Sequence, residues 1–361
     1  MAYTAIDDSS AYFKVQLYTG NGSANHAITF DDTDTNMQPD LVWIKNRSQN
    51  DGHCIFDAAR GATKLLDASV ADGETTDADT LDSFASDGFQ VDADVKVNTN
   101  TETYVAWCWK GGTTSGIDTT NTTITPDAYS FNATSGVSII KYDGNGTSGA
   151  KVAHGLGAIP EVVIIKTAGS SNSWAVYHHK NTSAPETDYL FLDTSGATAD
   201  DAGYWNDTTP TQYNVVLGGT GNTNGTGGDN PIVGYCFASK QGFSKFGTYK
   251  GDGNAANLGP FIYTGFKPAL VITKPSSEAD AWSLWDNKRP GYNDLLHQLF
   301  CHANSAESAG AANKSITFCS NGFKITGSDA GELNKDGDTY IYLAFAEAPF
   351  VNSEGVPATS G

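Results

Sequence analysis

The sequence predicts an all-β protein made of three tandem antiparallel β-sandwich domains of jelly-roll or lectin-like type. The first observation is a repeated string: PDLVWIK at Pro39–Lys45 returns as PEVVIIK at Pro160–Lys166 and as PALVITK at Pro268–Lys274. The second is the spacing between copies, roughly 110 to 120 residues, which suits one compact domain per copy. The third is the pattern inside each copy, where short apolar runs alternate with Gly and Asn turns. The best candidate for a helix, Asp294–Ala303, can equally be a strand.

The repeated string itself has the pattern of a strand that is buried on both faces. Each copy begins with Pro, where no sheet hydrogen bond is lost, and continues with an almost unbroken apolar run. Each copy ends with a lysine. Because Lys45, Lys166 and Lys274 persist in all copies, we interpret them as strand-end charges near an acidic neighbour rather than as ligand contacts.

Two further strands recur around this central one. An opening strand followed by a Gly-rich turn is predicted at Tyr12–Tyr18, Val137–Tyr142 and Phe246–Tyr249. An aromatic strand is predicted after the repeated string, at His53–Asp57, Trp174–His178 and Trp282–Asp286.

Acid–base pairs follow the aromatic strand in two of the copies. Asp57 precedes Arg60 in repeat one, and Asp286 precedes Arg289 in repeat three, each at the same separation. The spacing indicates local salt links, which near a surface contribute about 0 to 1 kcal/mol.

The closing strand of each copy carries large side chains on one face and mostly small ones on the other. Its copies are Tyr104–Lys110, Ile232–Ala238 and Tyr340–Ala346. We expect the large face to be core. The small face must be packed closely by another surface, either the opposite sheet or another chain.

The expected boundaries follow from these repeats. Repeat one covers 1–110, a Thr- and Gly-rich linker 111–135, repeat two 136–240, repeat three 241–352 and a polar tail 353–361. The linker is expected to be ordered only where it runs along another surface. The junction between repeats two and three is short, so these two repeats are expected to form a rigid pair.

Composition restricts the partners. The net charge is −20 and the pI near 4.5, so the surface repels nucleic acid and anionic membranes. We find no signal-peptide pattern and no apolar run of bilayer length. The cysteines lack metal-like spacing, and we expect reduced core residues at Cys54, Cys108, Cys236, Cys301 and Cys319.

No catalytic, metal or cofactor motif stands out. There is no Gly-Xaa-Ser-Xaa-Gly elbow, no HExxH and no Walker loop, and the histidines show no ligand spacing. The Asp- and Gly-rich turns after the opening strands are interpreted as turn geometry rather than as calcium loops. We therefore predict a protein that is not an enzyme and has no cofactor.

The candidate binding residues are aromatic. Tyr204 and Trp205 lie in a loop of repeat two outside any strand pattern, where they can stack on sugar rings or plug the open end of the sandwich. His179 and Tyr292, each just past an aromatic strand, are weaker candidates for a glycan site.

Several longer strings resemble a known family. The strings in repeat one are LYTGNG, PDLVWIKNRS, FDAARGATKLL, FASDGF and YVAWCWKGG, and those in repeat three are GFSKFGTYKGDG and TYIYLAFAEAPF. They resemble a repeated domain of unknown function in tail fibre and other virion structural proteins of marine phages, sometimes described as concanavalin-like lectins.

This resemblance implies a location on the virion, other virion proteins as partners, binding of host cell-surface glycans and a homotrimer. The alternative is a structural role as a head decoration, head fibre or adaptor protein. Under the adhesion hypothesis, Trp205→Ala is expected to weaken cell binding without unfolding the protein.

Overall fold

The computed structural model describes residues 3–30, 35–254, 257–289, 293–308, 313–328 and 331–357, and it confirms the all-β prediction. Helical structure in these residues is limited to single turns. The turns are η1 (Ser9–Ala11), α1 (Val95–Asn98), α2 (Ala202–Trp205), α3 (Gly221–Asn224) and η2 (Gly227–Asp229).

Repeat one pairs a large sheet with a small one. The large sheet has the order β1 (Phe13–Thr19), β9 (Thr103–Trp109), β3 (Leu41–Asn46), β4 (Cys54–Asp57), β5 (Gly61–Asp67), β6 (Thr75–Thr76). The small sheet has the order β2 (His26–Thr29), β8 (Gly88–Val91), β7 (Leu81–Ala85).

Repeat two has the same plan with an extra edge strand. Its large sheet has the order β10 (Ala128–Asn132), β11 (Val137–Tyr142), β18 (Ile232–Phe237), β13 (Val162–Thr167), β14 (Ala175–His178), β15 (Asp188–Phe191), β16 (Ala199–Asp200). The small sheet pairs β12 (Ala150–Ala153) with β17 (Asn214–Leu217). Strand β10 lies within the stretch expected to be linker, and it is hydrogen-bonded along the edge of β11.

Repeat three completes the series. Its large sheet has the order β19 (Ser244–Lys250), β26 (Thr339–Pro349), β21 (Phe266–Pro275), β22 (Ser283–Asp286), β23 (Leu299–Phe300), and its small sheet has β20 (Phe261–Tyr263), β25 (Gly322–Ile325), β24 (Ile316–Cys319). The segment considered for a helix contains β23 and no helix.

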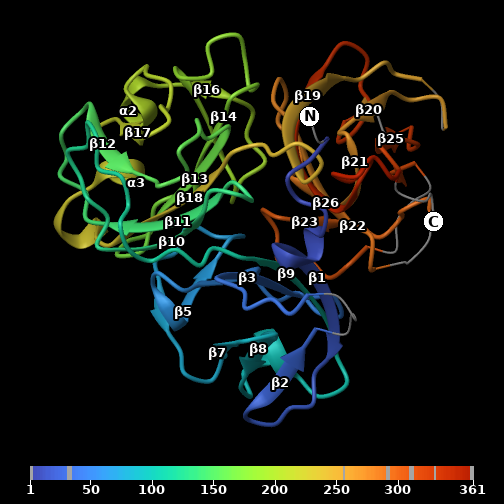
Figure 1. Cartoon of the computed structure of the whole chain (residues 1–361), viewed down its shortest axis with the longest axis horizontal. Coiled ribbons are helices and arrows are strands. Elements are labelled where there is room, and N and C mark those ends of the chain that lie inside the picture. Colours follow the sequence, from blue (N-terminus) through green and yellow to red (C-terminus); the bar gives the residue numbers. More distant parts are fainter. Residues whose placement is uncertain are drawn as a thin grey trace.

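Strand register shows that the repeats are copies of one sandwich. The closing strand lies between the opening strand and the repeated string in every copy, with partners Leu41–Trp109, Val162–Phe237 and Leu270–Phe345. Figure 1 shows the copies as three lobes around a common centre. Because the register is shared, each strand residue can be compared with the equivalent residues of the other two repeats.

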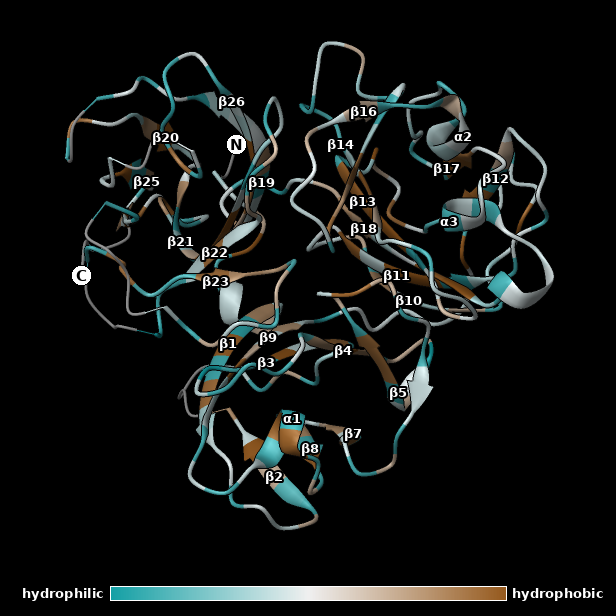
Figure 2. Cartoon of the chain, turned by 180° about the vertical axis from the view of Figure 1, so that it is seen from behind, coloured by the Kyte–Doolittle hydropathy of each residue, from teal (hydrophilic) through white to brown (hydrophobic). Residues whose placement is uncertain are grey.

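The two faces of the closing strands pack against different partners. The small faces lie inside each sandwich, where Ala106 and Cys108 belong to one core cluster and Cys236 belongs to another. The large faces meet at the centre of the molecule, where Trp109, Phe237 and Phe345 share a cluster drawn from all repeats. In Figure 2 the hydrophobic colour is concentrated on strands such as β11, β13 and β18. The small face is therefore covered by the opposite sheet, and repeat one joins the other two repeats in a single core.

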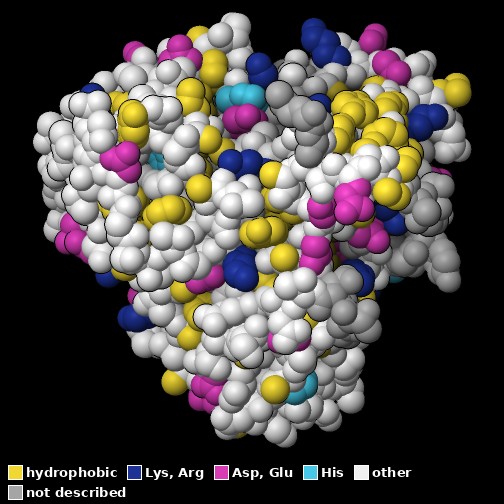
Figure 3. Space-filling view, in the orientation of Figure 1, with side chains coloured by type: hydrophobic (Ala, Val, Ile, Leu, Met, Phe, Trp, Pro, Cys, Tyr) yellow, Lys and Arg dark blue, Asp and Glu magenta, His cyan; other side chains and the backbone are white. Residues whose placement is uncertain are grey.

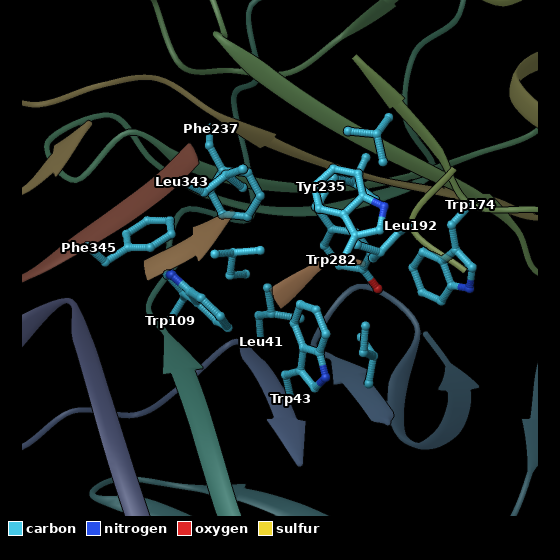
Figure 4. A pocket seen from close by; sticks show the side chains of 14 residues that line it. Leu41, Trp43, Trp109, Trp174, Leu192, Tyr235, Phe237, Trp282, Leu343 and Phe345 are labelled. Atoms are coloured by element: carbon cyan, nitrogen blue, oxygen red, sulfur yellow. The ribbon is translucent and has the colours of Figure 1, made fainter. Parts of the chain in front are cut away.

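The centre of this shared core holds a small apolar cavity. Its volume is about 40 Å³, and all three repeats line it (Figure 4). A cavity of this size is close to the volume of one water molecule, and its apolar lining gives a water no hydrogen-bond partner. We interpret it as a packing void rather than a ligand site.

Two buried ion pairs tie neighbouring repeats together. Arg60 Nε lies 2.6 Å from Asp57 Oδ2, which also accepts a 2.7 Å hydrogen bond from the Tyr235 hydroxyl of repeat two. Arg289 Nε lies 2.6 Å from Asp286 Oδ2, 3.1 Å from Trp107 Nε1 of repeat one.

The guanidinium and carboxylate groups of both pairs are at most 1% exposed. The predicted local salt links are therefore confirmed, but they are buried rather than near the surface, because the facing repeat covers each pair.

The strand-end lysines are buried and bonded to main-chain carbonyls rather than to acids. Lys45 Nζ donates to the carbonyls of Asn46 and Gln49, and Lys166 and Lys274 bond the equivalent carbonyls. Burial lowers the pKa of each ammonium group to about 8. These lysines close the turn after the strand, so their role is structural.

Candidate functional site

One interface between repeats is open as a groove. It has a volume of about 780 Å³ and lies between repeats two and three, alongside the edge strands β19 and β20. We call it the β19–β20 groove. Its lining residues are Tyr3, Glu161, His179, Lys180, Ser239, Gln241, Ser244–Tyr249, Phe261–Gly265 and Tyr342.

The floor of the groove results from an exchange of large and small side chains. Gly247 on β19 faces Tyr342 on β26, whereas the register equivalents pair Gln16 with Ala106 and Ile140 with Gly234. A Cβ on Gly247 would lie 2.6 Å from the Tyr342 hydroxyl, so the edge strand must be bare here. The large side chain of this pair, Tyr342, thus belongs to β26, and the edge strand β19 carries no side chain at Gly247 that would fill the groove.

A polar cluster from repeat two closes one end of the groove. His179 Nε2 lies 3.0 Å from the Phe246 carbonyl oxygen and 3.3 Å from Glu161 Oε2. The Ser239 hydroxyl donates to the same carboxylate at 2.5 Å. His179, predicted as a binding residue, therefore does line the groove, where it holds repeat two against β19.

Aromatic rings form the opposite rim. Phe261 and Tyr263 on β20 are 47% and 48% exposed, unusual values for large apolar rings. Lys245 Nζ lies 5.2 Å above the Tyr263 ring and donates to the Tyr263 carbonyl at 2.7 Å. The Tyr3 hydroxyl lies 3.1 Å from that of Tyr263. Figure 3 shows the hydrophobic side chains gathered over β20 on this face.

The other predicted aromatic residues do not contribute to a surface site. Tyr204 is 7% exposed and stacks on Tyr189 at 3.8 Å between ring centroids, and Trp205 is 1% exposed with its edge against Tyr177. Their short helix α2 plugs the end of the repeat-two sandwich. The stacking of sugars on these rings is therefore excluded in this conformation, because no ring face is free. Tyr292 lies outside the described residues.

The burial of Trp205 reverses the expected effect of its substitution. Trp205→Phe leaves a void beside Tyr177 and is expected to lower the free energy of unfolding by about 1–2 kcal/mol. Urea denaturation measures this change. Phe261→Ala is the control, because removal of an exposed ring is expected to change stability little, and equal stability of both variants would contradict the packing role.

Sequence reasoning missed Phe261 and Tyr263, although a signal was present. Their register equivalents are Ala27 and Thr29 in repeat one and Lys151 and Ala153 in repeat two. Aromatic residues peculiar to one copy do not serve the shared fold, and an alternating pair on a short edge strand points both rings to one side.

The described residues contain no group of three or more His, Cys, Asp or Glu side chains that could hold a metal ion. In the same part of the chain, no helix is long and apolar enough to cross a membrane. All five cysteines are free thiols.

The fold and the groove define a triple-repeat β-sandwich protein with an open groove between repeats two and three. A family model described as a domain of unknown function, DUF7483, matches residues 8–349, and the chain belongs to this family. The match runs through all three repeats. No curated protein and no solved structure matches the chain significantly.

Proposed function

We propose that this protein is a non-enzymatic structural component of a phage particle, and that it acts by attaching another virion protein through the β19–β20 groove. The phage assignment rests on the resemblance of the sequence strings to virion proteins. The attachment role rests on the open groove, which is bordered by two strand edges and two exposed rings.

The burial of Tyr204 and Trp205 favours attachment over adhesion. The adhesion hypothesis depended mainly on these rings, and both pack inside repeat two. The groove instead offers sheet edges, which recognise polypeptide backbones.

Adhesion to a host cell-surface glycan is the second candidate. Phe261 and Tyr263 favour it, because an exposed ring beside polar groups such as Glu161 and Lys180 can stack on a sugar while the polar groups bond its hydroxyls. Both functions use the same groove, so the experiment must separate them by ligand.

Adsorption competition and particle composition distinguish the two roles. Excess purified protein is expected to leave phage adsorption to host cells unchanged, because the groove meets the particle and not the cell. Phage whose only copy of the protein carries Phe261→Ala with Tyr263→Ala is expected to yield particles depleted of it, as measured by mass spectrometry of purified particles.

Val95→Ala is the matched control, since Val95 is an exposed apolar residue of repeat one that does not line the groove. Competition by the wild-type protein but not by the double variant would replace attachment by adhesion. Normal incorporation of the double variant together with absent competition would contradict any role of the groove.

A further inference from the structure

We propose that repeat three binds an extended segment of a partner polypeptide by strand addition, along the free edges of β19 at Thr248 and of β20 at Phe261. This inference rests on the proposed function and names its partner. In repeat two the same surface is covered by a segment of the chain itself.

In repeat two, the segment that precedes β11 wraps the open side of the sandwich. Strand β10 pairs with the edge of β11, with Ser130 opposite Ile139 and Ala128 opposite Lys141. Further upstream, the amides of Thr123 and Ile124 both donate to the Lys151 carbonyl at the edge of β12. Both edges of this sandwich are thus covered by one extended stretch.

Register gives the equivalent groups in repeat three. Lys141 corresponds to Thr248, because each lies opposite the matching residue of its closing strand, Val233 or Ile341. Lys151 corresponds to Phe261, because each precedes the residue that pairs with the second position of the facing strand, Val215 of β17 or Phe323 of β25. Thr248 and Phe261 are therefore the residues of repeat three whose backbone groups match those that the added segment covers in repeat two.

The backbone groups of Thr248 point away from the sheet. Gly251, which directly follows β19, exchanges backbone hydrogen bonds with the chain just before β26. Hydrogen-bonded positions alternate along an antiparallel strand, so the backbone groups of Tyr249 and Gly247 also point toward β26 and those of Thr248 point away from it. Within the described part of the chain, neither its N–H nor its carbonyl has a hydrogen-bond partner. An exposed edge with unpaired groups is a template for a further strand.

The same alternation leaves Phe261 free. The Ile325 amide donates to the Pro260 carbonyl and the Thr264 amide to the Asn321 carbonyl, so Phe261 faces away from β25. No partner for its backbone groups occurs among the residues that the structure describes.

Several neighbouring edge groups are already satisfied. Ser244 exchanges backbone hydrogen bonds with Lys240, and the Phe246 carbonyl faces His179. In repeat one, the side-chain amide of Gln16 donates to the carbonyl of Leu17, the residue equivalent to Thr248. Repeat three therefore offers a defined stretch that begins beyond Phe246 and runs along the groove.

The covering segment of repeat two also indicates the chemistry of the partner. Its rings Tyr129 and Phe131 alternate with small polar residues, and the Phe131 ring packs on Gly155. Two cationic side chains, Lys180 and Lys245, line the groove, although the chain as a whole has a net charge of −20. The expected partner segment is extended, carries alternating aromatic residues and has a nearby acid, as in TTITPDAYSFN, residues 122–132.

A synthetic peptide of this sequence tests the inference on the full-length protein. We expect binding detected by fluorescence anisotropy, with hydrogen exchange slowed about tenfold at the amides of Thr248 and Phe261 and unchanged along β11. Thr248→Pro removes the edge N–H and is expected to weaken binding about tenfold, whereas Thr248→Ala keeps the N–H and is expected to bind normally.

Other outcomes refute strand addition in distinguishable ways. Equal binding by the Pro and Ala variants would show that the edge is not used. Protection of these amides by host-surface glycan fragments but not by the peptide would assign the groove to sugars. If the peptide does not bind but particles are still depleted of the groove variants, strand addition is refuted and the proposed attachment function is retained.

Discussion

Arg289→Met is expected to lower the free energy of unfolding by about 3–5 kcal/mol, far more than a surface salt bridge would contribute. The side chains of Arg289 and Asp286 are both 0% exposed, so the substitution leaves a carboxylate without its charged partner. Arg289 also lies 3.1 Å from Glu307 and sits over the Trp107 ring of repeat one. The loss therefore affects the joint between two repeats as well as a single turn.

Urea denaturation of three variants checks this prediction. Lys288→Met is the matched control, because Lys288 is the exposed neighbour of Arg289 and should change stability little. The double variant Asp286→Leu with Arg289→Met is expected to regain part of the loss, since an apolar pair leaves no lone charge. A single variant within about 1 kcal/mol of wild type would show that the pair behaves as a surface pair.

The strands and their repetition could be predicted from sequence, because both depend on local patterns. Pro39–Lys45 and its copies are central strands, and the large and small faces of the closing strand face different surfaces. The assembly of the repeats could not be predicted. An apolar face such as that of Trp107 and Trp109 requires cover, but the sequence does not state which surface supplies it.

The same limit explains the errors about single residues. The separation of Asp57 and Arg60 is the same for a surface link and a buried one, and only the Tyr235 hydroxyl from another repeat decides between them. Trp205 has no strand pattern because it lies on one helical turn that plugs the sandwich. Of the residues predicted for binding that the structure describes, only His179 reaches the groove.

Stability is expected to fall between about pH 6.5 and pH 5, because buried histidines such as His178 and His53 stay neutral in the native protein. Burial first, with the nearby His179, lowers the pKa of His178 to about 3, and burial with Lys45 and Arg289 holds the pKa of His53 well below its usual range. Hydrogen bonds accepted by the unprotonated ring nitrogens add to the effect of burial. His178 Nδ1 accepts from the Lys180 amide, and His53 Nδ1 accepts from Trp43 Nε1 at 2.8 Å.

The sign follows from proton uptake. Below about pH 6.5 the unfolded chain protonates these rings and the native chain does not, so acid favours unfolding by about 2 kcal/mol per histidine at about pH 5. Glu307 acts in a lower window. Burial alone would raise its pKa, but Arg47, Arg289 and His297 lower it to about 2, so its stabilisation is lost as pH falls from about 4.5.

Urea titrations at several pH values separate these contributions. His178→Gln is expected to remove about 2 kcal/mol of the dependence between about pH 6.5 and pH 5. Protonation of His178 places the proton on Nδ1, so it removes the hydrogen bond from the Lys180 amide while Nε2 still faces the Tyr342 carbonyl. A flat stability profile down to about pH 5 would mean that these rings take up protons in the native protein as readily as in the unfolded chain.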